Sequence, residues 1–336
     1  MTDLGKQYKS TLVTIGGTML IWALFLNMFF GGVGAIDILL ELVPNKDVTE
    51  IISSVIYDAA YLGAFMLPVA FYYLLSRGKK VEPMRFDIKL SGDSWLWIIG
   101  GVACAFAFSL LNGMMMSFIE LPSDEGIIKE ATEYVSDQGL ILQFITIALV
   151  PAFCEEFLFR GLILSNLMPY GKGLAIVISS LLFGLMHGNF YQFLYTTVAG
   201  VILGLIYVRT GSIWCSVLMH MINNALSILQ TALLERFTEE TASVIWLAVE
   251  GAIFFAGLLC IVRLVIKHGQ RKPCGAQEAS SMFGKLPEAG ESYPEGVAAE
   301  LTHREAVRGF FNPAIIAFIV YALFNAASVL LLMPAL

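Results

Sequence analysis

The sequence predicts an all-α protein, a polytopic membrane helix bundle of about eight to nine transmembrane helices. Of its 336 residues, 57% are hydrophobic and only 14% are charged, whereas a soluble globular domain carries roughly 25% charged residues. The apolar residues are gathered into long runs that can cross a hydrocarbon core of about 30 Å. The loops between these runs alternate in charge. Together these three observations indicate an integral membrane protein.

Nine apolar segments follow one another along the chain. We expect them at 11–36, 51–75, 95–119, 140–168, 174–187, 190–208, 212–234, 242–266 and 310–336. Trp95 and Trp97 open the third segment as interfacial anchors. The fourth is long enough that it must tilt or protrude from the bilayer. The fifth is short and ends at Gly188, where the apolar run breaks.

Three regions are predicted from these segments. Residues 1–266 form the transmembrane helical bundle. Residues 267–309 are rich in Pro, Gly, Glu and Ser and have no periodic apolar face, which is typical of a flexible, solvent-exposed linker. Residues 310–336 form a separate C-terminal transmembrane helix.

Loop charges predict the orientation. Lys and Arg gather in the N-terminal segment and in residues 77–89, 169–173, 209–211 and 267–272. The intervening loops at 37–50, 120–138 and 235–241 are acidic. The two kinds of loop alternate across all nine segments, and loops rich in Lys and Arg remain in the cytoplasm. We therefore expect a cytoplasmic N-terminus and a cytoplasmic linker, in the plasma membrane if the host is a bacterium.

Three ionisable residues interrupt the fourth apolar segment: Glu155, Glu156 and Arg160. Charges at this depth cost several kcal/mol unless they meet partners or water, and they usually mark function. Glu156 and Arg160 are spaced i,i+4 with the acid first, which favours an ion pair within the helix. Glu155 points about 100° away around the helix. We therefore predict that Arg160 holds Glu156 and that Glu155 is free for chemistry.

Two histidines lie in other apolar segments, and each has an i,i+4 partner: Phe183 for His187, and Asn224 for His220. At about 1.5 Å per residue, Glu155, His187 and His220 lie roughly 20, 21 and 12 Å from the cytoplasmic ends of their segments. These depths fit one central slab of the membrane. The depths therefore allow the three side chains to share a cavity within the membrane.

A glutamate, two histidines and an amide in such a cavity can hydrolyse an amide bond. The carboxylate can take a proton from water, one imidazole can position that water, and the other imidazole and the amide of Asn224 can stabilise an oxyanion. Glu155, His187 and His220 also match a zinc set of two histidines and one carboxylate, with water as the fourth ligand. The residues alone leave both mechanisms open, so the cofactor is either none or zinc.

The ordered motifs EExxxR, FxxxH and HxxxN resemble the CPBP family (CAAX proteases and bacteriocin-processing enzymes), which includes the type II CAAX prenyl endopeptidases. The matching residues span a core of about 140–234, so the linker and last helix lie outside it. The resemblance implies an intramembrane endopeptidase whose substrate is a peptide or lipidated protein at the membrane, such as a lipidated C-terminus or a bacteriocin or pheromone precursor. Membrane lipid is the other expected partner.

The resemblance also implies roles for the motif residues. Glu155 would activate the attacking water, and His187 would bind that water or move a proton. His220 and Asn224 would stabilise the oxyanion. Three residues would support the site: Glu156, Arg160 and Phe183. Both metal-dependent and glutamate-type mechanisms are described for the family, and we favour the latter because Glu155 and Asn224 have roles without a metal.

Two other functions fit parts of the pattern. A non-catalytic scaffold or bacteriocin immunity factor could use the same fold, although it has no need of Glu155 and His187 together. A proton-coupled transporter also uses intramembrane acids and histidines, but no inverted repeat is visible. No basic patch with interleaved aromatics supports a nucleic-acid partner. The five cysteines lack CxxC spacing, so neither a disulfide framework nor a thiolate metal site is predicted.

Overall fold

The computed structural model describes residues 1–40, 43, 45–78, 81–87, 90–118, 139–269 and 301–332. These ranges contain helices and connecting segments, and no strand. The helices are α1 (Asp3–Leu40), α2 (Lys46–Leu75), α3 (Gly92–Ser117), α5 (Leu140–Gln143), η1 (Phe144–Leu149), α6 (Val150–Glu156), η2 (Phe157–Leu164), α7 (Ser165–Leu167), η3 (Met168–Tyr170), α8 (Lys172–Met186), α9 (Phe190–Thr210), α10 (Ile213–Arg236), α11 (Glu239–Gly269), α13 (His303–Phe310) and α14 (Pro313–Leu332).

The prediction of an all-α, polytopic membrane bundle is confirmed. Within the described ranges, seven helices are long and apolar enough to cross a membrane, or up to eight if α13 and α14, bent by 58°, form one span. The structure therefore differs from the nine segments expected. The fifth segment corresponds to α8, which has only 15 residues, and the ninth is one arm of a bent pair. The acidic loop expected at 120–138 lies outside the described residues.

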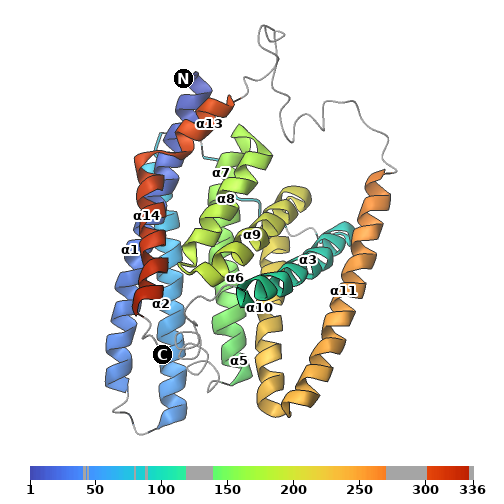
Figure 1. The fold of residues 1–336 in the computed structure, drawn as a ribbon. Helices are drawn as coiled ribbons and strands as arrows, with labels where there is room; N and C mark the ends of the chain where they lie inside the picture. The colour runs from blue at the N-terminus through green and yellow to red at the C-terminus, as the bar shows by residue number, and fades with distance from the viewer. Residues whose placement is uncertain are drawn as a thin grey trace.

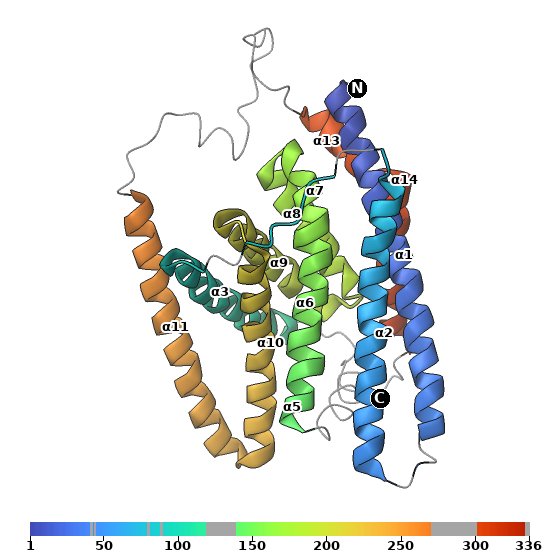
Figure 2. The same cartoon turned by 180° about the vertical axis from the view of Figure 1, so that it is seen from behind.

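The helices form two upright groups with oblique helices between them. Helices α1, α2 and α14 stand together on one side, and α10 and α11 form a hairpin on the other (Figure 1). The continuous helix from α5 to η3 stands between these groups when the bundle is seen from behind (Figure 2). Helices α3 and α9 cross obliquely through the middle and pack on each other. This crossing places α8, α9, α10 and α6 around one central region.

Segments predicted to share the cytoplasmic side lie at one end of the bundle. The N-terminus, α7 and the C-terminal end of α11 all lie at this end (Figures 1 and 2). At the same end Lys267 pairs with Asp93, and the backbone N–H of Ile213 donates to the carbonyl of Arg85, 3.0 Å away. The grouping agrees with the alternation of loop charges. The side of the membrane on which this end lies remains a prediction.

The C-terminal helices pack closely against the first helix. A side chain at Gly16 of α1 would place its Cβ 2.8 Å from the backbone of Ala314 in α14, so the two helices touch through a residue without a side chain. The predicted linker, residues 267–309, overlaps two helices. Residues 267–269 continue α11, and residues 303–309 belong to α13. Residues 270–300 lie outside the described part. The last predicted helix, α14, is thus part of the bundle, because it packs against α1.

A carboxylate joins α13 to the N-terminus. The backbone N–H and the hydroxyl of Thr2 both donate to Glu305 Oε1, at 2.5 and 2.9 Å, and the Thr302 hydroxyl donates to Oε2 at 2.9 Å. These hydrogen bonds, led by the backbone N–H of Thr2, lower the pKa of Glu305 to about 2. An unfolded glutamate has a pKa of about 4.3. The contact therefore stabilises the fold above roughly pH 4.3, and this stabilisation is lost as the pH falls towards 2.

Replacing Glu305 with glutamine should remove this pH-dependent stabilisation. We expect Glu305→Gln to unfold at a lower temperature than the wild type at pH 6, and the difference to shrink as the pH falls below 4. Thermal unfolding of the detergent-solubilised chain across this range measures it. Glu235→Gln, at the other end of the bundle, is the control and should show no such trend. A difference between Glu305→Gln and wild type that is independent of pH would contradict the assignment.

Candidate active site

The helix that carries the two glutamates is not a regular α-helix. Residues 140–170 form one continuous rod, in which the π-helical stretches η1 and η2 flank the short α6 that holds Glu155 and Glu156. π-Helical turns are frequent at functional sites because they free backbone groups and redirect side chains. Pro151 contributes to this irregularity. It has no N–H, so it cannot make the α-helical bond to the carbonyl of Ile147. That carbonyl is left available to another helix.

Glu155 is buried, with 5% of its surface exposed, and its two oxygens have different surroundings. The hydroxyl of Tyr61, on α2, donates a hydrogen bond of 2.6 Å to Oε1. Oε2 is buried and has no hydrogen-bond partner among the described residues. It lies 3.9 Å from Nε2 of His220. Tyr61 therefore fixes one oxygen of the carboxylate, and the other oxygen accepts no hydrogen bond from the described residues.

Glu156 and Arg160 form the ion pair expected from their spacing. Arg160 Nη1 donates to Glu156 Oε1 at 2.8 Å, and both side chains are completely buried. Arg160 Nη2 donates to the carbonyl of Gly200 at 3.0 Å, and the guanidinium lies 4.5 Å from the ring centre of Phe183, a cation–π distance. A Cβ at Gly200 would lie 3.0 Å from Ser180 of α8, so α8 and α9 are in close contact at this glycine.

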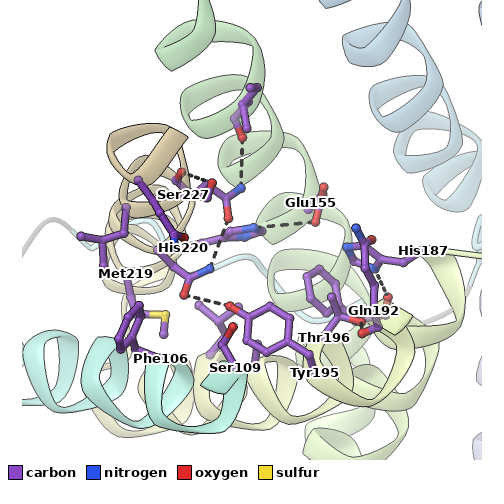
Figure 3. Close-up of a pocket in the computed structure, with 18 of the residues that line it drawn as sticks. Phe106, Ser109, Glu155, His187, Gln192, Tyr195, Thr196, Met219, His220 and Ser227 are labelled. Carbon is purple, nitrogen blue, oxygen red and sulfur yellow. Dashed lines mark hydrogen bonds and ion pairs between the residues drawn. The ribbon is translucent and has the colours of Figure 1, made fainter. Parts of the chain in front are cut away.

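His220 bridges the two glutamates. Its Nδ1 is 3.0 Å from Glu156 Oε1, and its Nε2 faces Glu155 (Figure 3). A carboxylate paired with arginine can only accept, so Nδ1 carries the proton of this hydrogen bond. Neutral His220 therefore presents a lone pair at Nε2, and only the imidazolium presents an N–H there.

His187 ends α8 and is held by the backbone of its own helix. Its Nδ1 lies 2.9 Å from the carbonyl of Phe183, which can only accept, so Nδ1 donates and Nε2 keeps its lone pair. The ring of Phe183 meets the rings of His187 and His220 edge to face, with centroids 5.1 and 5.9 Å apart. The predicted Phe183–His187 pair thus supports both histidines, and Figure 3 shows Glu155 between them.

Asn224 is oriented by a chain of hydrogen bonds. Its Nδ2 donates to the carbonyl of Ile147 at 3.0 Å, the group that Pro151 leaves without its α-helical donor. The Tyr195 hydroxyl donates to Asn223 Oδ1 at 2.9 Å, and Asn223 Nδ2 makes a longer contact of 3.4 Å to Asn224 Oδ1. An amide nitrogen has two N–H groups, so Asn224 retains one donor for a ligand in the cavity.

These side chains meet at a single cavity of about 430 Å³ (Figure 3). Five of the seven predicted site residues line it: Glu155, Phe183, His187, His220 and Asn224. Glu156 and Arg160 are not among the lining residues. Glu156 contacts Nδ1 of His220, and Arg160 pairs with Glu156. Away from the glutamate the wall mixes apolar side chains with polar ones, and the polar ones include Ser109, Gln192, Asn223, Ser227 and Gln230. A smaller cavity of about 60 Å³ shares Gln230 and Trp246 with it, beside the α10–α11 hairpin.

Three residues that hydrogen-bond to the site or orient its side chains were not predicted from the sequence: Tyr61, Asn223 and Tyr195. Asn223 directly precedes a predicted site residue, so its polarity within an apolar segment was a usable signal. Tyr61 and Tyr195 belong to no motif. Asp58, one turn before Tyr61, makes an interhelical bond, in which the Thr146 hydroxyl donates to its Oδ2 at 3.4 Å. Cys154 is buried and does not line the cavity.

The alternative zinc set does not fit the site as its side chains lie. Among the described residues, no three His, Cys, Asp or Glu side chains are placed to hold one metal ion. The set proposed from sequence was Glu155, His187 and His220, and of these Glu155 Oε1 is already engaged by Tyr61. We therefore derive no step through a metal.

Comparison with known proteins connects this geometry to a family. Residues 137–226 match the family described as type II CAAX prenyl endopeptidase Rce1-like. The chain is also 28% identical over 195 residues to a Bacillus subtilis (strain 168) protein named "Putative membrane peptidase YdiL", an alignment that covers 56% of this chain and 78% of that protein. No solved structure matches significantly. The match over residues 137–226 of this polytopic membrane protein thus supports the resemblance to the CPBP family of intramembrane proteases that the three motifs predicted.

Proposed function

We propose that the protein is an endopeptidase that hydrolyses a peptide bond of a membrane-associated substrate by means of a glutamate-activated water. One observation carries the proposal: the unpartnered Oε2 of Glu155 lies in a cavity that is shared with two histidines and an asparagine. A buried acceptor with no protein partner suits a water molecule, which can donate to it and be deprotonated by it.

The reaction has two steps. The water oxygen forms a bond to the carbonyl carbon while its proton passes to Glu155 Oε2, and the lone pair on His187 Nε2 holds the water in place. The carbonyl oxygen becomes an oxyanion, which the spare N–H of Asn224 and the Nε2–H of protonated His220 stabilise. Glu155 then gives its proton to the amide nitrogen, the carbon–nitrogen bond breaks, and a carboxylic acid and an amine leave, which exchange a proton to become a carboxylate and an ammonium.

Protonation of His220 is the demanding part of this scheme. Nδ1 already donates to Glu156, so Nε2 can donate to an oxyanion only from the imidazolium. Two carboxylates flank the ring, at 3.0 and 3.9 Å, and their charges offset that of an imidazolium paired with the oxyanion. Glu156 therefore serves the oxyanion through His220, in addition to its ion pair with Arg160.

The substrate is a peptide that reaches the cavity from the membrane, as part of a lipidated C-terminus or of a bacteriocin or pheromone precursor. The carboxamides and hydroxyls of the cavity wall can bond to a peptide main chain, which has one donor and one acceptor per residue. The test is mass spectrometry of membrane peptides from cells that carry wild-type or Glu155→Ala protein. Peptides found only with the wild type would identify the cleavage site, whereas identical peptide sets would refute the proposal.

Chelation separates the glutamate mechanism from a metal-dependent one. We expect hydrolysis by the purified protein to persist after treatment with 1,10-phenanthroline and dialysis, because no step requires a metal. The assay uses a quenched fluorescent peptide with the cleavage sequence found by mass spectrometry, and elemental analysis of the dialysed protein is the control. Loss of activity on chelation, restored by Zn²⁺, would replace the glutamate mechanism with a zinc mechanism.

A further inference from the structure

Two polar contacts join α2 to the helix that carries Glu155. Tyr61 donates to Glu155 Oε1 at 2.6 Å, and Asp58 accepts from the Thr146 hydroxyl at 3.4 Å. Asp58 and Tyr61 are three residues apart and so lie on the same face of α2. Both side chains meet the helix that carries Glu155. The contact between Tyr61 and Glu155 is therefore part of a polar seam between the two helices.

The ring of Tyr61 is held by its neighbours, which restricts where its hydroxyl can point. It stacks on Phe65 with centroids 4.7 Å apart and on Tyr57 at 6.3 Å. A stacked ring with only two side-chain torsions directs its hydroxyl with little freedom. The hydrogen bond to Glu155 is short, and the acceptor is a carboxylate, the stronger class of acceptor.

We propose that Tyr61 is a positioning residue for the general base, which engages Oε1 of Glu155 so that Oε2 alone faces the substrate water. The proposal rests on the proposed function, and it extends the machinery to α2, outside the matched residues 137–226. Without the hydroxyl, both oxygens compete for the water and the carboxylate can rotate. The carboxylate also loses the hydrogen-bond donor to its charged form.

The experiment compares Tyr61→Phe with wild type in steady-state hydrolysis of the fluorescent peptide, from pH 5 to pH 9. A hydrogen bond to a charged group is worth about ten- to a hundredfold in rate. We expect kcat at pH 7 to fall by that factor with KM unchanged, and the acidic limb of the kcat profile to move to higher pH. The loss should therefore shrink at alkaline pH.

Two further variants sharpen the result. Tyr73→Phe removes the hydroxyl of an exposed tyrosine further along α2 and should behave as wild type. 3,5-Difluorotyrosine at position 61 keeps the ring and makes the hydroxyl a stronger donor, so the acidic limb should move to lower pH. Opposite shifts in the two Tyr61 variants would establish the positioning role, and they provide a second test if Tyr61→Phe does not fold.

Other outcomes separate this inference from the proposed function. If Glu155→Gln is inactive but Tyr61→Phe keeps the kcat and pH profile of the wild type, the inference is wrong and the proposed function stands. A loss in Tyr61→Phe that is equal at every pH would mean a structural role only, and would also overturn it. Hydrolysis by Glu155→Gln at the wild-type rate would remove the proposed function itself.

Discussion

Replacing Glu155 with glutamine should reduce hydrolysis by roughly a thousandfold or more, within the range that general acid–base catalysis contributes. Glutamine has nearly the same shape as glutamate, and its carbonyl oxygen can still accept the hydrogen bond from Tyr61. The amide nitrogen that replaces Oε2 cannot take a proton from water. We therefore expect the fold to survive and the reaction to stop, with steady-state cleavage of the fluorescent peptide as the measurement.

The matched control for Glu155→Gln is another intramembrane acid. Glu250 lies in α11 and does not line the cavity, so Glu250→Gln changes the same charge elsewhere in the bundle. It should keep wild-type activity. The thermal unfolding midpoint of Glu155→Gln should stay close to that of the wild type, which distinguishes a catalytic loss from a folding defect. Full activity in Glu155→Gln would assign the base to another group.

Local spacing predicted the part of the site that lies within single helices. The pair Glu156–Arg160 and the pair Phe183–His187 follow from i,i+4 geometry, which is a property of the sequence alone. The depths of Glu155, His187 and His220 followed from the rise per residue. The structure brings these side chains to one cavity. The relative positions of such residues can be predicted from the sequence, because the regular geometry of a helix fixes them.

Contacts between distant helices could not be predicted in this way. Tyr61 reaches Glu155 across 94 residues of chain, and no periodicity in α2 distinguishes it from Tyr57. The bond between Asn224 and the carbonyl of Ile147 depends on a backbone group that Pro151 frees and that the π-helical winding aims. That winding is set by packing rather than by local propensity. Each of these features requires knowledge of which helices are neighbours.

The C-terminal region shows the same limit. The polar composition of 267–309 predicted a linker, yet α13 is helical and joined to the N-terminus by Glu305. Eight residues make too short a helix to be stable alone in water. Its order comes from Thr2, the capping residue Thr302 and the close approach of Tyr8 to Gly309. Thr2 and Tyr8 are far from α13 in the sequence, and a single capping threonine is too short a signal to predict a helix.

The largest effects on stability should come from breaking the ion pair between Glu156 and Arg160. Both side chains are fully buried, and removing one partner of a buried pair costs about 3–5 kcal/mol because the other charge is left without compensation. We expect Glu156→Gln and Arg160→Met each to lower the free energy of unfolding by that amount. Reversible unfolding in detergent micelles, or the shift in thermal midpoint, measures it. Asp3→Asn, which breaks the exposed pair with Lys6, should cost less than about 1 kcal/mol.

The double variant Glu156→Gln/Arg160→Met separates the two roles of Glu156. Removing both charges leaves none uncompensated, so the double variant should be more stable than the sum of the single effects predicts, by about 0.5–3 kcal/mol. Its activity should remain low, because a glutamine at 156 can accept the Nδ1–H of His220 but carries no charge to favour the imidazolium. Strictly additive losses of stability would show that the pair is not coupled. Recovery of activity together with stability would show that His220 acts in its neutral form, so that Asn224 alone stabilises the oxyanion.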